Sequence, residues 1–436
     1  MPAGSAALRT ATAPDAYQSE LQLPPAPPSV LPFADEDVTA RAPAPVRPLQ
    51  PLIVVPMVDA GAAGAGVVDL VRILASAGHR PIVVSEGGSR VNDLGAYGAE
   101  IFPLRVASIN PLVMLANVPR LMRIMRARDC DLVHAHGRAA AWSAYLAARL
   151  MRRPLITTWH KGFRDQNVFK RLYNGIMARG LRVIVVSDQI AELLGERYGL
   201  PASRIDVIPP SVDLECFDPA AIAPARIQAL RQSWGAGPHV KVMLVVGRMS
   251  RRKGHHIVVD AVARLKALGL KDFVCVFASE GGVRTRYAGD LWDRVLATGT
   301  GDCVRLAGRI DDLPAAYAAA SVVVSAAVQA EGVQRATLEA QAMARPVIVS
   351  DLSAGADVVL APPVVSEERM TGLRFPAGDA SALAAAIVRL FSVPEASRRA
   401  IGARGRAWAS ANFNPATVRE QTLALYEAVG RARTRH

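Results

Sequence analysis

The sequence predicts an α/β protein with two doubly wound parallel sheets, each forming a Rossmann-like domain. Short apolar segments alternate with helical patterns from Pro51 to about residue 430. Strand–helix alternation with short links is typical of parallel sheets whose crossover connections are helices. The alternation is interrupted once, near residues 210–238, which divides the ordered chain into two halves of similar size.

The first half begins with an apolar strand and a small-residue turn that leads into a helix. Pro119 predicts a kink in the long helix at 111–128. The strands of this half are expected at 51–57, 80–86, 101–104, 130–136, 154–160, 181–187 and 204–210. The helices are expected at 67–78, 88–99, 111–128, 140–151, 167–179 and 188–199.

The second half repeats this architecture without repeating the sequence. Its strands are expected at 239–247, 273–279, 304–308, 321–326 and 346–350. Its helices are expected at 255–269, 287–299, 313–320, 335–344, 381–392, 394–413 and 415–433. Ligands of such sheets bind beyond the carboxyl ends of the strands, so two halves can bind ligands across a cleft between them.

These patterns predict five segments. The first is rich in Pro and Ala, with 10 of the 30 prolines, and has too little apolar surface to offset its ordering entropy. The segments are a disordered arm (1–49), an N-terminal domain (50–212), a connector (213–238), a C-terminal domain (239–414) and a final helix (415–436).

The composition is that of a globular protein, with 51% apolar and 20% charged residues. No uncharged apolar run reaches the roughly 18 residues of a membrane-spanning helix, and the N-terminus lacks the pattern of a secretory signal. Four cysteines, Cys130, Cys216, Cys275 and Cys303, are scattered without paired spacing. This usage suits a reducing compartment, so a cytoplasmic location is expected.

The net charge of +13 is concentrated in one part of the chain. Residues 105–182 contain 15 Lys and Arg against 3 Asp and Glu. Such a surface attracts an anionic membrane or an acidic glycolipid, or is a solvated basic face. The helix at 111–128, which mixes Leu and Met with Arg, is the best candidate for peripheral contact with the inner membrane face. Nucleic-acid binding is not expected, because interleaved aromatic residues are lacking.

Two glutamates lie in the stretch from Ser325 to Asp351, with Glu331 in a loop and Glu339 inside the following helix. A helix that begins just beyond a strand directs unpaired N–H groups at the crevice, which favours a phosphate there. Glu339 is then placed to accept hydrogen bonds from both hydroxyls of a ribose. On spacing alone, both residues could equally be exposed surface acids.

A basic turn follows the first strand of the second half. Arg248 lies at the end of that strand and Lys253 precedes the next helix. These two cations could neutralise a diphosphate, Arg through its fork of donors and Lys as a point charge. The alternative is a solvated turn.

No metal site is expected. His134 and His136 stand two positions apart on a strand, where we expect them to point to opposite or nearly opposite sides, and no third ligand is evident.

The basic turn (GRMSRRKG) and the later EGVQRATLEAQAMARPVIVS together resemble the retaining GT-B glycosyltransferases of family 4. The likeness covers about residues 51–430 and is greatest to the branch that builds the lipopolysaccharide core and surface polysaccharides. The segments that match this branch include DLVHAHGRAAAWSAYLAAR, PLITTWHKGF and RIDVIPPSVDLECFDP. The resemblance implies a GT-B fold with two Rossmann-like domains across a cleft. The N-terminal domain (50–212) would lie on the acceptor side and the C-terminal domain (239–414) would bind the nucleotide-sugar, with the final helix (415–436) packed back on the N-terminal domain.

The resemblance also implies roles for single residues. Arg248 and Lys253 would bind the diphosphate of a nucleotide-sugar, and Glu339 would hold its ribose. Glu331 would lie beside the donor sugar, and His160 would face acceptor and donor. Gly61 would allow the backbone of the first turn to approach the ligand. The expected activity is transfer of a sugar to a saccharide or lipid-linked saccharide, with retention and without a metal.

Several positions depart from the family pattern. Gln334 stands where the family usually has Gly, Ser353 and Ala354 replace a Gly pair, and Ser211 replaces another Gly. Glycines at such positions allow backbone amides to approach phosphate closely. The departures therefore leave open an alternative, a non-catalytic relative that binds a nucleotide-sugar or a partner enzyme.

Overall fold

The computed structural model describes residues 47–432, except 60–61, 161–166, 280–284, 330–331 and 353–357. The described residues all belong to one compact unit. The predicted arm therefore lies almost wholly outside the described residues. Leu49, which the prediction assigned to the arm, is buried in the apolar core with Leu425 and Val429.

The first sheet has seven parallel strands in the order β3-β2-β1-β4-β5-β6-β7. Its strands are β1 (Pro51–Val54), β2 (Ile82–Ser85), β3 (Glu100–Pro103), β4 (Leu132–His136), β5 (Leu155–Trp159), β6 (Arg182–Val185) and β7 (Ile205–Val207). The associated helices are α1 (Ala62–Ser76), α2 (Val91–Ala96), α3 (Pro111–Ala127), α4 (Arg138–Leu150), α5 (Val168–Gly175) and α6 (Asp188–Tyr198). The helix expected at 167–179 changes to a 3₁₀ turn at Ile176.

The second sheet has six parallel strands in the order β10-β9-β8-β11-β12-β13. Its strands are β8 (Lys241–Val246), β9 (Phe273–Ala278), β10 (Val304–Gly308), β11 (Val322–Ser325), β12 (Val347–Ser350) and β13 (Gly372–Phe375). The helices of this half are α7 (Pro224–Ser233), α8 (His255–Ala267), α9 (Arg286–Ala297), α10 (Leu313–Ala319), α11 (Arg335–Ala342), α13 (Ala380–Ser392) and α14 (Glu395–Asn412). The prediction of two doubly wound parallel sheets is confirmed.

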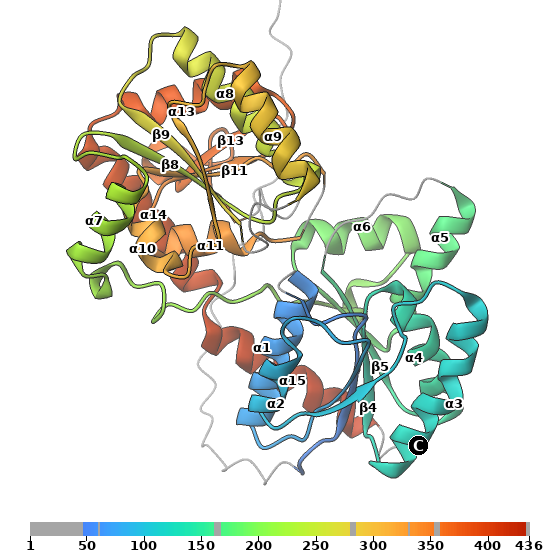
Figure 1. Cartoon of the computed structure of the whole chain (residues 1–436). Helices are drawn as coiled ribbons and strands as arrows, with labels where there is room; N and C mark the ends of the chain where they lie inside the picture. Colours follow the sequence, from blue (N-terminus) through green and yellow to red (C-terminus); the bar gives the residue numbers. More distant parts are fainter. Residues whose placement is uncertain are drawn as a thin grey trace, which may run out of the picture. The chain divides into compact units, whose positions relative to one another are not determined.

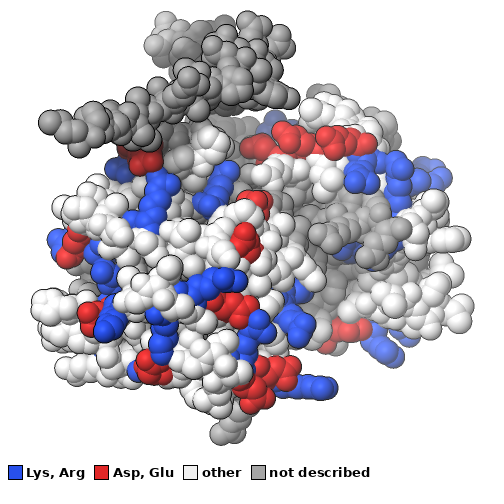
Figure 2. Space-filling view, turned by 90° about the horizontal axis from the view of Figure 1, so that it is seen from above, with Lys and Arg blue, Asp and Glu red and all other residues white. Residues whose placement is uncertain are grey.

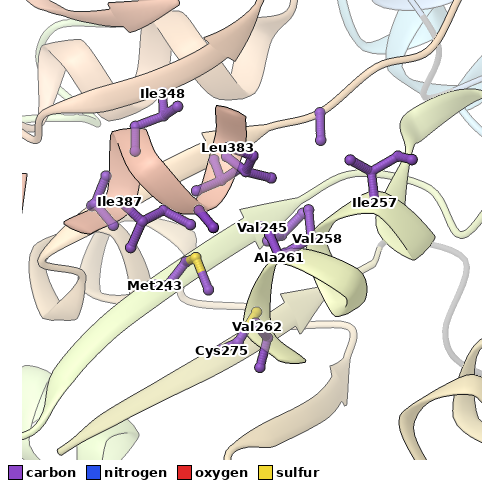
Figure 3. Close-up of a cluster of buried hydrophobic side chains, with 14 of the residues drawn as sticks. Met243, Val245, Ile257, Val258, Ala261, Val262, Cys275, Ile348, Leu383 and Ile387 are labelled. Carbon is purple, nitrogen blue, oxygen red and sulfur yellow. The ribbon is translucent and has the colours of Figure 1, made fainter. Parts of the chain in front are cut away.

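Helices cover both faces of each sheet (Figure 1). The central strands read as continuous apolar runs because both of their faces are buried, as in β1 and β4. In the second half, side chains of α8 and α13, including Val258 and Leu383, pack against Met243 of β8 (Figure 3). These layers hold the strand ends, and hence the loops that follow them, in fixed positions.

Each sheet has a switch point, where the strand order reverses. In the first sheet β1 pairs with β2 on one side and β4 on the other, and in the second β8 pairs with β9 and β11. Crossover connections leave these neighbouring strands in opposite directions, which opens a crevice at their carboxyl ends. A ligand site is expected at both places.

Among the described residues, no single helix has the length and apolarity to cross a membrane. One pair, Ala380–Ser392 with Glu395–Arg431, passes the same criteria only as a broken span bent by 113°.

The final helix, α15 (Pro415–Ala432), packs on α1 of the N-terminal domain. Tyr426 is fully buried, and its hydroxyl lies 2.6 Å from Nδ1 of His134 on β4. Nε2 of the same ring lies 2.7 Å from Oγ1 of Thr158 on β5. The last helix is therefore joined to the centre of the first sheet by a buried polar network.

Tyr426→Phe should lower the free energy of unfolding by about 1–3 kcal/mol, because it leaves a buried ring nitrogen without its partner. Urea denaturation measures this change. Tyr97→Phe, at a position 40% exposed, is the matched control and should leave stability unchanged. Equal stability of the two variants would contradict the role of this hydrogen bond.

Candidate functional site

A cavity of about 550 Å³ lies where the carboxyl ends of the two sheets meet. Residues of both halves line it. From the first half these are Pro56, Met57, Ala63, Ala65, Arg90, His136, Gly137, Arg138, Thr158, Trp159, His160 and Met177. From the second half they are Val246, Gly247, Arg248, Arg252, Lys253, Leu313, Gly332, Val333, Gln334, Arg335, Ala336 and Glu339. Four predicted site residues, Arg248, Lys253, Glu339 and His160, are thus brought to one cavity.

Two predicted residues, Glu331 and Gly61, lie outside the described residues, as do Ser353 and Ala354. The roles given to Glu331 and Gly61 stay predictions. Ser211 is described and lines a smaller apolar cavity of about 100 Å³ behind the histidines.

The turn after β8 positions the two cations of the second half. Arg248 is exposed at the end of this strand, and Lys253 is half-buried in a single 3₁₀ turn. The turn closes at Gly254, whose φ of +69° is left-handed and whose ideal Cβ would lie 1.7 Å from the carbonyl oxygen of Ala326. Only glycine fits there, so the loop after β11 is held directly against the turn that carries Lys253.

Helix α11 presents its first turn to the cavity. Gln334 is its N-cap residue, and the side chain makes no capping hydrogen bond. The first N–H groups of a helix have no partner within it, and the helix dipole places positive charge at this end. The arrangement suits an anion next to Arg248 and Lys253.

Glu339, one turn further along α11, is fixed by a residue that the sequence did not single out. The hydroxyl of the fully buried Tyr317 on α10 donates a hydrogen bond of 2.8 Å to Oε2 of Glu339. Phe217 packs edge-on against the Tyr317 ring. The signal in the sequence that could have identified Tyr317 is a single Tyr within an Ala-rich helix. A carboxylate accepts hydrogen bonds from hydroxyl groups, and this contact holds Glu339 in one orientation at the cavity.

Three histidine rings lie close together on the N-terminal side, and two of them, His136 and His160, line the cavity. Rings of His134 and His136 lie with centroids 4.2 Å apart, and Nδ1 of His136 lies 2.8 Å from Nε2 of His160. The expectation that His134 and His136 point to opposite sides is wrong, because residues two apart on a strand share one face. Among the described residues no group of three possible ligands is placed to hold a metal ion.

Burial keeps these histidines neutral at physiological pH. Desolvation lowers the pKa of His160 to about 4 and that of His134 to about 3, and the pKa of His136 also lies well below its ordinary value. Neutral imidazoles carry one donor and one acceptor each, so His160 suits contact with uncharged sugar hydroxyls.

An ion pair joins the two halves beside the cavity. Arg335, in the first turn of α11, pairs with Asp69 of α1. The backbone also comes close at this point, since an ideal Cβ on Gly332 would lie 1.8 Å from the carbonyl oxygen of His160. Neither contact was predicted, because both depend on the relative placement of the halves.

The sequence matches profiles of two glycosyltransferase domains. Residues 63–216 match Glycosyltransferase Family 4, and residues 240–392 match Glycosyl transferases group 1. Together the matches cover more than half of the 436 residues. The chain belongs to glycosyltransferase family 4. The GT-B fold expected from the resemblance is confirmed, and the chain is a glycosyltransferase.

Individual relatives agree with this assignment. The chain is 29% identical over 342 residues to a D-inositol 3-phosphate glycosyltransferase of Salinispora tropica, covering 73% of this chain and 68% of the relative. A crystal structure of a Rickettsia africae glycosyltransferase superposes with a TM-score of 0.77 and 26% identity, covering 88% and 99% of the two chains. Anabaena HepE, in complex with UDP-glucose, has the same fold (TM-score 0.74, 20% identity, 87% and 100% coverage). The lipopolysaccharide branch stays a prediction.

His134→Gln should reduce the loss of stability that the glycosyltransferase undergoes in acid. In the unfolded state His134 has a pKa near 6.5, whereas in the folded state its pKa is about 3. The free energy of unfolding therefore contains the full His134 contribution above pH 6.5 and loses it as the pH is lowered towards 3. The His134 contribution is about 1 kcal/mol per pH unit in this window. His136, His160, Thr158 and Tyr426 face the ring, and the two histidines titrate with it.

The measurement is urea denaturation at pH 7.5, 6.5, 5.5 and 4.5. Between pH 6.5 and 4.5 the wild type should lose about 2 kcal/mol more than His134→Gln. The exposed His239→Gln is the control and should follow the wild type. If the free energy of unfolding of all three proteins depends on pH in the same way, the buried neutral state of His134 is refuted.

Proposed function

We propose that this glycosyltransferase takes its sugar from a nucleotide-diphosphate donor bound on the C-terminal side of the cavity. The observation that carries the proposal is the convergence of Arg248, Lys253, the first turn of α11 and Glu339 on one cavity. Two cations and a helix N-terminus suit the diphosphate, and the carboxylate held by Tyr317 suits the ribose hydroxyls.

The proposed reaction breaks the bond between the anomeric carbon and the diphosphate oxygen, and forms a bond from that carbon to an acceptor oxygen. The diphosphate oxygen leaves with the bonding pair, and the acceptor hydroxyl passes its proton to that oxygen. Arg248, Lys253 and the α11 amides stabilise the charge that develops on the leaving group, the task that a metal ion performs in other sites. Retention of configuration is part of the proposal, and it rests on the resemblance to retaining enzymes.

The acceptor is proposed to be a hydroxyl compound that also carries phosphate, such as a phosphorylated polyol or saccharide. On the N-terminal side, Arg90 and Arg138 line the cavity, and no Asp or Glu among the described residues of that half does so. Arg138 lies over the Trp159 ring, at 5.5 Å from its centroid. The Salinispora relative's name, with its phosphorylated inositol, supports the same class of acceptor.

Donor binding is tested by thermal unfolding with a panel of UDP-, GDP- and ADP-sugars. The correct donor should raise the melting temperature, since it binds only the folded state. Lys253→Ala should weaken donor binding by about 1.5–3 kcal/mol, because it removes a charge-assisted hydrogen bond. Lys271→Ala, on an exposed turn, is the control and should bind the donor as the wild type does.

Turnover decides between an enzyme and the non-catalytic alternative. The assay combines the stabilising donor with phosphorylated and neutral hydroxyl acceptors, and NMR assigns the anomeric configuration of the product. Donor binding without hydrolysis or transfer to any acceptor would favour the non-catalytic relative. An inverted product would refute retention.

We also propose that the basic part of the N-terminal domain contacts an anionic membrane surface. Helix α3 exposes Leu112 (75%) and Leu115 (57%), and α5 exposes Phe169 (83%) and Leu172 (64%). Both helices lie against α4, since Ser143 bonds to the carbonyl of Met114 and Trp142 to that of Tyr173. Exposed apolar side chains beside arginines are typical of interfacial attachment.

On the face shown in Figure 2, Lys and Arg lie among acids and uncharged residues rather than in one continuous field. Several basic residues of the 105–182 segment are also neutralised locally. Arg128 pairs with Glu100, Arg153 with Asp129 and Arg182 with Asp206. The exposed Arg120, Arg123 and Arg126 on α3 are therefore the cations assigned to the membrane contact.

Replacing Arg123 and Arg126 together by Gln should weaken binding to phosphatidylglycerol vesicles by roughly 25-fold, at about 1 kcal/mol per charge. Co-sedimentation measures this, with phosphatidylcholine vesicles for comparison. Arg264→Gln, an exposed position on α8, is the control. Equal binding of the wild type to both kinds of vesicle would exclude the electrostatic contact.

A further inference from the structure

Gln334 occupies the position where the family pattern has Gly, yet its side chain does not close the head of α11. The residue is 9% exposed and lines the cavity. Its Oε1 accepts hydrogen bonds from Nζ of Lys253, at 3.2 Å, and from Oγ of Ser325, at 2.9 Å. The amide group therefore lies between the end of β11 and the basic turn after β8.

These contacts fix the orientation of the amide. A lysine ammonium group only donates hydrogen bonds, so the oxygen of Gln334 must face Lys253. The Nε2 group then points the other way. Among the described residues no group accepts a hydrogen bond from Nε2, and this nitrogen is not among the buried unpaired atoms. It is an accessible N–H donor in a residue that lines the cavity.

We propose that Gln334 binds the diphosphate of the donor through Nε2 while Oε1 holds Lys253 in place. The side-chain N–H group replaces the close backbone approach that a glycine would allow at this position. An anion at the N-terminus of α11 then accepts hydrogen bonds from three kinds of donor: the amide of Gln334, the ammonium of Lys253 and the first-turn N–H groups of the helix. The inference rests on the proposed function, because it assumes a nucleoside diphosphate in this cavity.

Two variants separate the two tasks of the side chain. Gln334→Ala removes both the N–H donor and the oxygen that holds Lys253, and should weaken nucleoside diphosphate binding by about tenfold. Gln334→Glu is isosteric and keeps acceptor oxygens for Lys253 and Ser325. It replaces the N–H donor with a negative oxygen that repels phosphate, and should bind more weakly than Gln334→Ala.

The experiment is isothermal titration calorimetry of the full chain with UDP, GDP and ADP, and with the matching nucleosides. Both variants should lose affinity for the diphosphate while the nucleoside binds as in the wild type, because Gln334 is assigned to the phosphate groups. Gln228→Ala, at an exposed position on α7, is the matched control and should bind as the wild type does. Circular dichroism verifies that each variant is folded.

The outcomes distinguish this inference from the function on which it rests. A wild type that binds none of the three diphosphates contradicts the proposed function, and the inference with it. If the wild type binds one of the diphosphates and both Gln334 variants bind it with the same affinity, the inference is overturned and the proposed function stands. If Gln334→Ala does not fold, the isosteric Gln334→Glu decides, and wild-type affinity in that variant refutes the role of Nε2.

Discussion

The cavity between the two halves depends on their close backbone approach at Gly332 and His160. A single methyl group on Gly332 would collide with the carbonyl oxygen of His160, so the loop before α11 lies directly against the end of β5. The Arg335–Asp69 ion pair lies beside this contact. Together they bring the switch points of the two sheets to one cavity, which residues of both halves line.

Charge is distributed unevenly around that cavity. Described cations from both halves line it, whereas Glu339 is the one carboxylate among the described lining residues. The histidines add no charge, because burial lowers the pKa of His160 and of its neighbours. A site with this balance is suited to highly anionic ligands, and its neutral rings and the Tyr317–Glu339 pair provide the directional contacts that uncharged hydroxyls need.

Gln334 departs from the family pattern, and the structure shows where its side chain lies. On the sequence alone, a side chain at a glycine position suggested a blocked phosphate site. The side chain turns instead to Ser325 and Lys253, where its oxygen has two donors. A long polar side chain can therefore leave the head of the helix open, whereas a short apolar one would leave Lys253 without this contact.

The sequence by itself determined the two sheets, since apolar runs such as β1 and β8 are buried on both faces and the links between elements are short. It also placed Arg248, Lys253, Glu339 and His160 at strand ends or in the helix that follows, because these positions depend on local chain order. Tertiary structure alone decided the Tyr317–Glu339 bond, the stacking of His136 on His160 and the anchoring of Tyr426. These contacts join residues far apart in the chain, and long-range packing leaves no periodic signal in the sequence.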